Sequence, residues 1–279
     1  MEIRRAWGGV WAGRDANGFL TVTLENPALR CKYGLLVSDE ADGPVFETNI
    51  TSFFIKSEQQ DQVQSLSREG GDRIDAAAWR GLLSEVDVTR EDADRITLRM
   101  AWTPVRGPAQ VQEVTIHKGA AYLQIRYVAW FVNIVDFASP GGTHQGEYAI
   151  HGAERWIRPY TYYPQIYFDR APSDVGQENI TEVEDPAPLD YKGWFIMGIY
   201  HPANGVGYGR VMPVEAIDII KLLFNDARLG KRGFELFPYY QREHQPYTGY
   251  LFPVSGGLKG AIRAGQAIAD GACAGNLIP

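Results

Sequence analysis

Alternating apolar and polar positions predict β-strands in the first half of the chain. Runs of strand length, rich in β-branched and aromatic residues, occupy residues 19–24, 96–102, 111–116 and 122–128. The short segment His117–Ala120 separates the last two runs and contains a glycine. Residues 111–128 are therefore predicted to form a β-hairpin.

The second half of the chain repeats this pattern of strand, turn and strand. Further runs cover residues 194–200, 205–211, 217–224 and 233–240, and Asn204-Gly205 provides a hairpin turn between the first two. Amphipathic helices do not alternate with these strands, whereas a parallel sheet needs crossover connections that are usually helical. The pattern predicts an all-β protein, a large antiparallel β-sandwich.

Two segments depart from the strand pattern. Residues 171–190 contain three prolines with acidic residues between them and are predicted to form an extended connection within one fold. Residues 256–274 contain helix formers and predict one short C-terminal helix, although Gly260 and Gly265 weaken it by about 1 kcal/mol each.

Composition is that of an ordinary globular protein with a sizeable core. The chain has 279 residues, a formal net charge of −7, 45% hydrophobic residues and 22% charged residues. This length would allow two domains, but large β-sandwiches reach it as one unit. We predict a single β-sandwich domain over residues 1–279.

Charge and cysteine content narrow the set of partners. The acidic balance without a Lys/Arg cluster argues against nucleic acid as a partner, because phosphate neutralisation supplies most of that affinity. No long apolar run follows Arg4 and Arg5, so we expect no signal peptide, no membrane association and a cytoplasmic location. Cys31 and Cys273 do not form a disulfide framework or a thiolate metal site. The pattern leaves open whether the chain forms a homo-oligomer.

The first candidate for chemistry is the glycine-bearing segment 141–158. His144, Glu147 and His151 are of the residue types that act as general acids and bases. On a helix the three would share a face and could bind a metal, but the glycines argue against a helix, and on a strand His144 points away from the other two. We therefore expect catalytic residues here without a bound metal or cofactor. The alternatives are a three-ligand metal site, which would need a bulge or a turn, and ordinary surface or core residues.

The second candidate is an aromatic segment that overlaps the end of the first. Sugars present apolar C–H faces and a rim of hydroxyl groups, which a cleft lined by aromatic rings and charged side chains matches. The alternative is that the rings pack the edges of a large β core. The predicted substrate-binding residues of this segment are Trp156, Arg158, Tyr160, Tyr162 and Tyr163.

A third group lies at predicted strand ends in the last part of the chain, where titratable residues often function. Glu235, Glu243 and His244 are further catalytic candidates, and His201 and Tyr247 are further substrate-binding candidates. An exposed Glu-His pair can equally be solvated without any function. No Gly-x-Ser-x-Gly motif is present, so nucleophilic hydrolase chemistry has no positive signal.

The layout of residues 90–255 resembles the galactose-mutarotase-like supersandwich family. The likeness consists of long antiparallel strands, a His-bearing segment after a mid-chain hairpin, an aromatic cleft and a late carboxylate. The resemblance implies a His as general acid on the ring oxygen, here His144 or His151, and a Glu as base on the anomeric hydroxyl, here Glu243 or Glu235. The family's Asn-His-x-x-Tyr-Phe motif is absent from this sequence.

The leading hypothesis is an enzyme acting on a small sugar or an oligosaccharide, as an anomer or epimer isomerase, a lyase or a glycosidase. Residues 144–168 and 235–247 would line one sugar-binding cleft. One alternative is a non-catalytic carbohydrate-binding or assembly module. Another is a metal-dependent enzyme of the cupin type, which the missing His-x-His motif disfavours.

Overall fold

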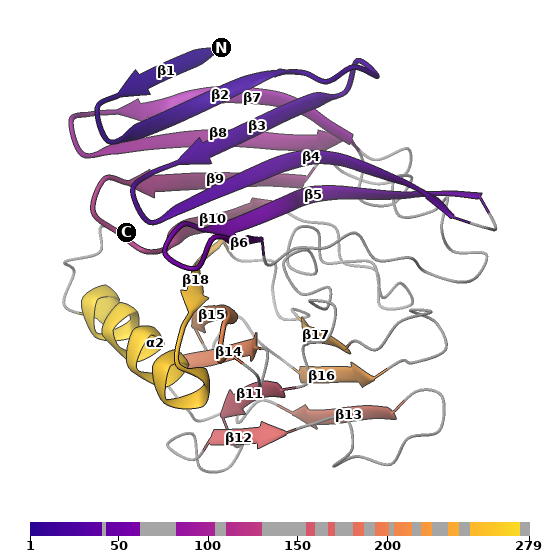
Figure 1. Ribbon diagram of the computed structural model, residues 1–279, viewed down its shortest axis with the longest axis vertical. Helices are drawn as coiled ribbons and strands as arrows, with labels where there is room; N and C mark the ends of the chain where they lie inside the picture. Colours follow the sequence, from indigo (N-terminus) through magenta and orange to yellow (C-terminus); the bar gives the residue numbers. More distant parts are fainter. Residues whose placement is uncertain are drawn as a thin grey trace.

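The computed structural model shows an antiparallel β-sandwich with one helix near the C-terminus (Figure 1). The predicted fold class is confirmed. The predicted hairpin at 111–128, the hairpin around Asn204-Gly205 and the helix are present too. The structure describes residues 1–40, 43–61, 82–103, 110–129, 155–159, 167–170, 181–186, 193–200, 204–213, 219–224, 234–239 and 246–273.

The first sheet is a meander of six strands that follow one another along the chain. Each strand pairs antiparallel with the next. The strands are β1 (Glu2–Arg5), β2 (Gly8–Arg14), β3 (Leu20–Glu25), β4 (Leu29–Glu40), β5 (Gly43–Ile55) and β6 (Gln60–Asp61).

The second sheet has nine strands in the order β12-β11-β14-β15-β18-β10-β9-β8-β7. Its strands β7 to β10 lie behind the first sheet in Figure 1, and the remaining strands continue below them. The bounds are β7 (Leu82–Glu91), β8 (Arg95–Thr103), β9 (Gln110–His117), β10 (Leu123–Ala129), β11 (Arg155–Pro159), β12 (Tyr167–Arg170), β14 (Trp194–Tyr200), β15 (Gly207–Pro213) and β18 (Tyr247–Val254).

A third, smaller sheet has the order β13-β16-β17. Its strands are β13 (Thr181–Pro186), β16 (Ile219–Phe224) and β17 (Phe234–Tyr239). β13 lies inside residues 171–190, which were predicted as an extended connection, so that prediction was wrong for these six residues. A strand accommodates this segment because its proline stands at the last position, where it interrupts no interior pairing.

The main hydrophobic core fills the space between the first sheet and strands β7 to β10. On β8 the residues Ile96, Leu98 and Met100 are fully buried in this core, while Thr97 and Arg99 between them are only half-buried. Successive side chains of a strand point to opposite faces, so this alternation assigns the intervening residues to the outer face of the sheet. The sandwich thus leaves a polar face on β7 to β10.

Helix α2 (Gly257–Cys273) covers the same outer face further along the sheet, over β14, β15 and β18. A second hydrophobic cluster, which includes Val211, Phe252 and Ala261, lies beneath the helix. At Gly265 an added Cβ would stand 2.4 Å from Cγ2 of Ile196. The glycine that weakens the helix in isolation is therefore the residue that lets it approach β14.

A polar cluster is enclosed on the inner side of the nine-stranded sheet. Arg210 is 3% exposed, and its Nη1 donates a hydrogen bond to Oη of Tyr127 at 3.1 Å. The ring of Tyr127 stacks on that of Tyr247, its partner in the β10–β18 register, with centroids 4.6 Å apart. Burial raises the pKa of Tyr33, which approaches this group from the first sheet, well above its usual value.

Within the described residues, the structure contains no helix that is long and apolar enough to cross a membrane.

Candidate functional site

A hollow of about 200 Å³ opens on the outer face of strands β7 to β10. It lies on the face opposite to the first sheet, beside the part that helix α2 covers. Its lining residues come from all four strands: Thr89, Arg90, Arg95, Thr97, Glu113, Thr115, Gln124 and Arg126.

The middle of the hollow is a row of three neutral polar residues across β8, β9 and β10. Thr97 stands opposite Thr115, and Thr115 stands opposite Gln124. The two threonine hydroxyls lie 2.9 Å apart and share a hydrogen bond. Thr115 and Gln124 are buried among their neighbours although they lie on the outer face. This row forms the floor of the hollow.

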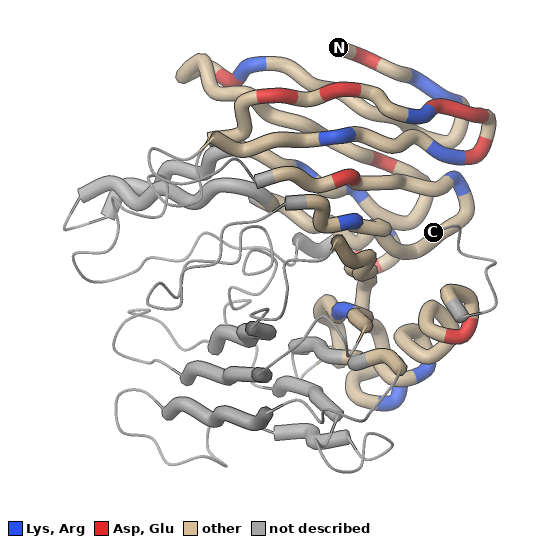
Figure 2. Tube along the Cα trace, turned by 180° about the vertical axis from the view of Figure 1, so that it is seen from behind, with Lys and Arg blue, Asp and Glu red and all other residues tan. Residues whose placement is uncertain are grey.

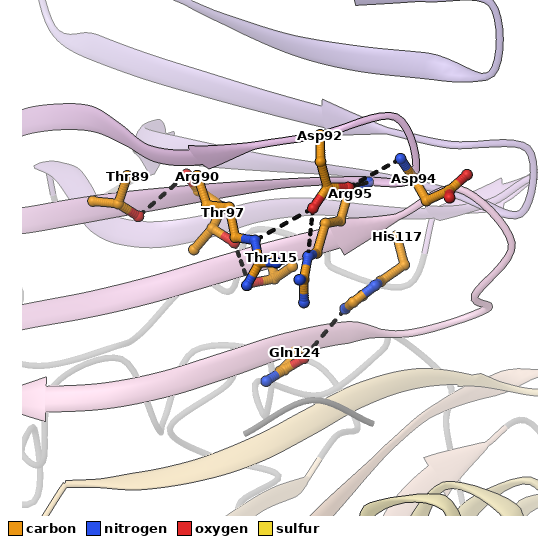
Figure 3. A network of polar contacts seen from close by, with 9 residues as sticks. All are labelled: Thr89, Arg90, Asp92, Asp94, Arg95, Thr97, Thr115, His117 and Gln124. Carbon is orange, nitrogen blue, oxygen red and sulfur yellow. Dashed lines mark hydrogen bonds and ion pairs between the residues drawn. The ribbon is translucent and has the colours of Figure 1, made fainter. Parts of the chain in front are cut away.

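An arginine pair held by one aspartate forms a rim of the hollow (Figure 3). Asp92, in the β7–β8 turn, accepts a hydrogen bond from Nε of Arg95 at 2.8 Å and one from Nε of Arg90 at 3.3 Å. The same carboxylate accepts the backbone N–H groups of Asp94 and Arg95, so its position is fixed by the turn. Among the described residues, the terminal nitrogens of Arg90 and Arg95 have no partner.

A second ion pair lies on the other side of the floor. Nη1 of Arg126 on β10 donates to Oε2 of Glu113 on β9 at 2.9 Å, and the two residues are opposite in register. Both side chains are partly exposed, which limits what the pair contributes to stability to about 1 kcal/mol at most. The pair is therefore available to a ligand at little cost to the fold.

His117, at the end of β9, orients the amide of the floor. Its Nε2 lies 3.2 Å from Oε1 of Gln124. The backbone carbonyl of His117 accepts a hydrogen bond from the buried side chain of Asn26, which joins this turn to the first sheet. The β9–β10 turn is thus fixed on both faces of the sheet.

Aromatic side chains continue the floor toward helix α2. Tyr250 stands opposite Gln124 in the β10–β18 register, and its ring meets that of half-buried Tyr122 edge to face, with centroids 5.5 Å apart. Tyr122 in turn lies 5.9 Å from the ring of His117. Burial raises the pKa of Tyr250 to about 12, with a smaller contribution from Tyr122, and burial also raises the pKa of Tyr122. Both phenols therefore remain hydrogen-bond donors at neutral pH.

This arrangement is suited to binding a polar ligand. Hydroxyl, amide and guanidinium groups can exchange hydrogen bonds with a ligand that lies against the sheet. Beside this lining the half-buried ring of Tyr122 adds an apolar edge, whereas Tyr250 is 4% exposed and packs beneath α2. One carboxylate, Glu113, belongs to the described lining, and Arg126 holds it. Within the part of the chain that the structure describes, His, Cys, Asp and Glu form no group of three or more that could hold a metal ion.

Most of the residues that the sequence nominated lie outside the described residues. These are His144, Glu147, His151, Tyr160, Tyr162, Tyr163, His201, Glu243 and His244. Trp156 and Arg158 are on β11, near one edge of the nine-stranded sheet. Glu235 is on β17 in the three-stranded sheet, opposite Leu223 of β16.

Tyr247 is the nominated residue whose side chain the structure places. It lies at the start of β18 and is buried on the inner side of the sheet against Tyr127. β14 and β15 separate β18 from β11, and the registers place Trp156 level with Pro253, six residues along β18 from Tyr247. Three strand spacings across the sheet and six residues along it put Tyr247 and Trp156 roughly 25 Å apart. That residues 144–168 and 235–247 line one cleft stays a prediction.

Sequence reasoning did not identify the hollow. Its residues occur singly, as the polar positions of strands β7 to β10, and each of them is ordinary for the exposed face of an antiparallel sheet. The available signal was the repetition of hydrogen-bonding residues, Thr97, Thr115 and Gln124, on the outward positions of three successive strands. Finding it requires the register between the strands.

A scan against protein-family models and a search of characterised proteins both gave no match to this chain. The resemblance to the galactose-mutarotase-like family therefore stays a prediction.

Proposed function

We propose that this protein binds carbohydrate in the hollow on the outer face of β7 to β10. The observation that carries the proposal is the row Thr97, Thr115 and Gln124, which continues in register into Tyr250. Tyr250 itself is 4% exposed, and the half-buried ring of Tyr122, which packs on it, provides an aromatic edge beside these neutral hydrogen-bonding groups.

The chemistry of a sugar matches both parts of this row. Its hydroxyl groups donate and accept hydrogen bonds, as threonine hydroxyls and a glutamine amide do. Its C–H face can pack against Tyr122, the half-buried ring that separates His117 from Tyr250. A hollow of about 200 Å³ would take one or two sugar residues and leave the rest of a chain in solvent.

The described lining favours binding over hydrolysis at this position. Glycoside cleavage commonly uses two carboxyl groups on either side of the scissile bond, whereas the described lining offers Glu113 alone. An enzymatic role would depend on the His and Glu residues nominated from the sequence, of which the structure describes only the backbone of Glu235. The proposed function is therefore carbohydrate binding. Whether the protein also turns a sugar over is tested by substituting the His and Glu residues proposed from the sequence.

Isothermal titration calorimetry against neutral and acidic oligosaccharides tests this proposal. We expect a saccharide to bind, and Thr97→Val to weaken its binding by about 3- to 10-fold, which is what the loss of one hydrogen bond produces. Thr248→Val on β18 is the matched control, because it makes the same change on the same face outside the lining. The control should leave affinity unchanged.

Two results would contradict the proposal. One is a complete panel without a binding saccharide while the protein is folded. The other is binding that Thr97→Val, Tyr122→Ala and Arg126→Gln all leave intact, because these substitutions change the floor of the hollow, the ring beside it and its rim. Thermal unfolding of each variant confirms that a lost signal is not lost folding.

A further inference from the structure

We infer that the hollow recognises an acidic sugar, a saccharide with a carboxylate such as a uronic acid, through Arg95 and Arg126. This inference rests on the proposed function and names its ligand class. It follows from the rim, which is charged, and not from the floor, which is neutral.

Arg95 is prepared to receive a carboxylate. Its side chain is 11% exposed and its Nε is held by Asp92 at 2.8 Å, which fixes the plane of the guanidinium group. Figure 3 shows the end of this side chain directed toward the side of the sheet where Gln124 and His117 lie. The two terminal nitrogens, which have no partner among the described residues, present the parallel N–H pair that binds a carboxylate through two hydrogen bonds.

Arginines approach the floor from several strands. Arg90 comes from β7, Arg95 from β8 and Arg126 from β10, and all three line the hollow. Against them stand two carboxylates, Glu113 in the lining and Asp92 behind the rim. The site therefore carries a formal excess of one positive charge, in a protein whose net charge is −7. Elsewhere on these strands positive and negative residues are interspersed (Figure 2).

Substituting Glu113 should change the affinity for an acidic sugar in a defined direction. It holds Arg126 at 2.9 Å and would repel a carboxylate that seeks the same guanidinium. Replacing Glu113 by Gln should strengthen binding of an acidic sugar and leave binding of a neutral sugar nearly unchanged. If the site instead prefers neutral sugars, Glu113→Gln should not strengthen the binding of the acidic sugar relative to the neutral one.

The matched probes are tetragalacturonate and its carboxyl-reduced derivative, which differ only in the charged group. Calorimetry at low ionic strength should show the acidic form binding at least about 10-fold more tightly, because hydrogen bonds to charged groups are stronger than neutral ones. Added salt should reduce that preference, since the arginine rim is partly exposed.

Three variants and a control locate the preference. Arg126→Gln and Arg95→Lys should each reduce the preference for the acidic form, the second because lysine keeps the charge but loses the paired N–H geometry. Glu113→Gln should increase it. Arg99→Gln is the control, because Arg99 is on the same face of β8, has 40% side-chain exposure against 44% for Arg126, and does not line the hollow.

The outcomes separate this inference from the proposed function. Equal binding of the two probes, or a preference that Arg126→Gln and Arg95→Lys both leave intact, overturns the acidic-sugar inference and preserves carbohydrate binding. Binding of inorganic sulfate as tight as that of tetragalacturonate overturns it too, because the site would then bind any anion. If neither probe nor any other saccharide binds to the folded protein, the proposed function itself fails.

Discussion

Asn26 donates a hydrogen bond from Nδ2 to the backbone carbonyl of His117 at 2.7 Å, and thereby ties the first sheet to the turn that orients the floor of the hollow. The same nitrogen donates to the carbonyl of Ala120 at 2.8 Å, while Oδ1 accepts the backbone N–H groups of Ala28 and Leu29, both at 2.9 Å. Asn26 is fully buried, and its amide is satisfied on both sides.

Replacing Asn26 by Ala should lower the free energy of unfolding by about 2 kcal/mol or more. The change leaves buried backbone groups without partners, and each such group costs about 1–3 kcal/mol. Asn17→Ala, in an exposed turn, is the control and should change stability by less than about 0.5 kcal/mol. Urea unfolding followed by far-UV circular dichroism measures both. Equal stabilities of the two variants would show that the link between the sheets is unimportant.

Gly265→Ala should destabilise the protein by about 1–3 kcal/mol, although alanine is the better helix former. The added Cβ would stand 2.4 Å from Cγ2 of Ile196, so the helix or β14 must shift, and overpacking of this kind has that cost. Ala267→Gly tests the opposite case at an exposed position, where loss of helix propensity alone should cost about 1 kcal/mol. A Gly265→Ala variant more stable than wild type in thermal unfolding would refute the close contact.

Alkaline pH should destabilise the protein through Tyr250. Burial raises the pKa of this phenol to about 12 in the folded state, above its ordinary value of 10.0. A raised folded-state pKa means that the contribution of the neutral phenol is complete below pH 10 and is lost between pH 10 and about pH 12. Urea unfolding at pH 8, 10 and 11 should therefore show a smaller alkaline decline for Tyr250→Phe than for wild type. An equal loss of stability with pH in both proteins would show that groups other than Tyr250 cause the alkaline destabilisation.

Substitution of the residues nominated from the sequence decides between binding and catalysis. If the protein turns over a sugar, His151→Ala or Glu243→Ala should lower kcat by about 10²- to 10⁴-fold, the usual effect of losing a general acid or base. Turnover is measured on a panel of glycans, with thermal unfolding as the control for folding. Turnover at the wild-type rate in both variants would show that His151 and Glu243 are not the general acid and base. A protein that binds sugar without turnover is the non-catalytic module.

Local pattern was sufficient for the elements that carry their own periodicity. β8, β9, β10 and β14 were predicted because β-branched and aromatic residues alternate within each run, and the β9–β10 hairpin followed from the short connection between them. β2 has no such signal. It begins with Gly8 and Gly9 at φ angles of 147° and 155°, where an added Cβ would stand 2.0 Å from the carbonyl oxygen of Glu25 and 2.1 Å from that of Ile3. Glycine at these two positions allows the backbones of β1 and β3 to approach closely, and a local sequence pattern does not reveal such contacts.

The sequence by itself determined that the chain is an antiparallel β protein with a C-terminal helix, because periodicity and turn residues act over a few positions. Only the tertiary structure decided where its polar groups meet. β10 pairs with β18, more than a hundred residues away, and this pairing sets Gln124 beside Tyr250. The registers of β7 to β10 then bring arginines from three strands around one floor. Register depends on burying one face of every strand at once, so the site arises from the whole sheet.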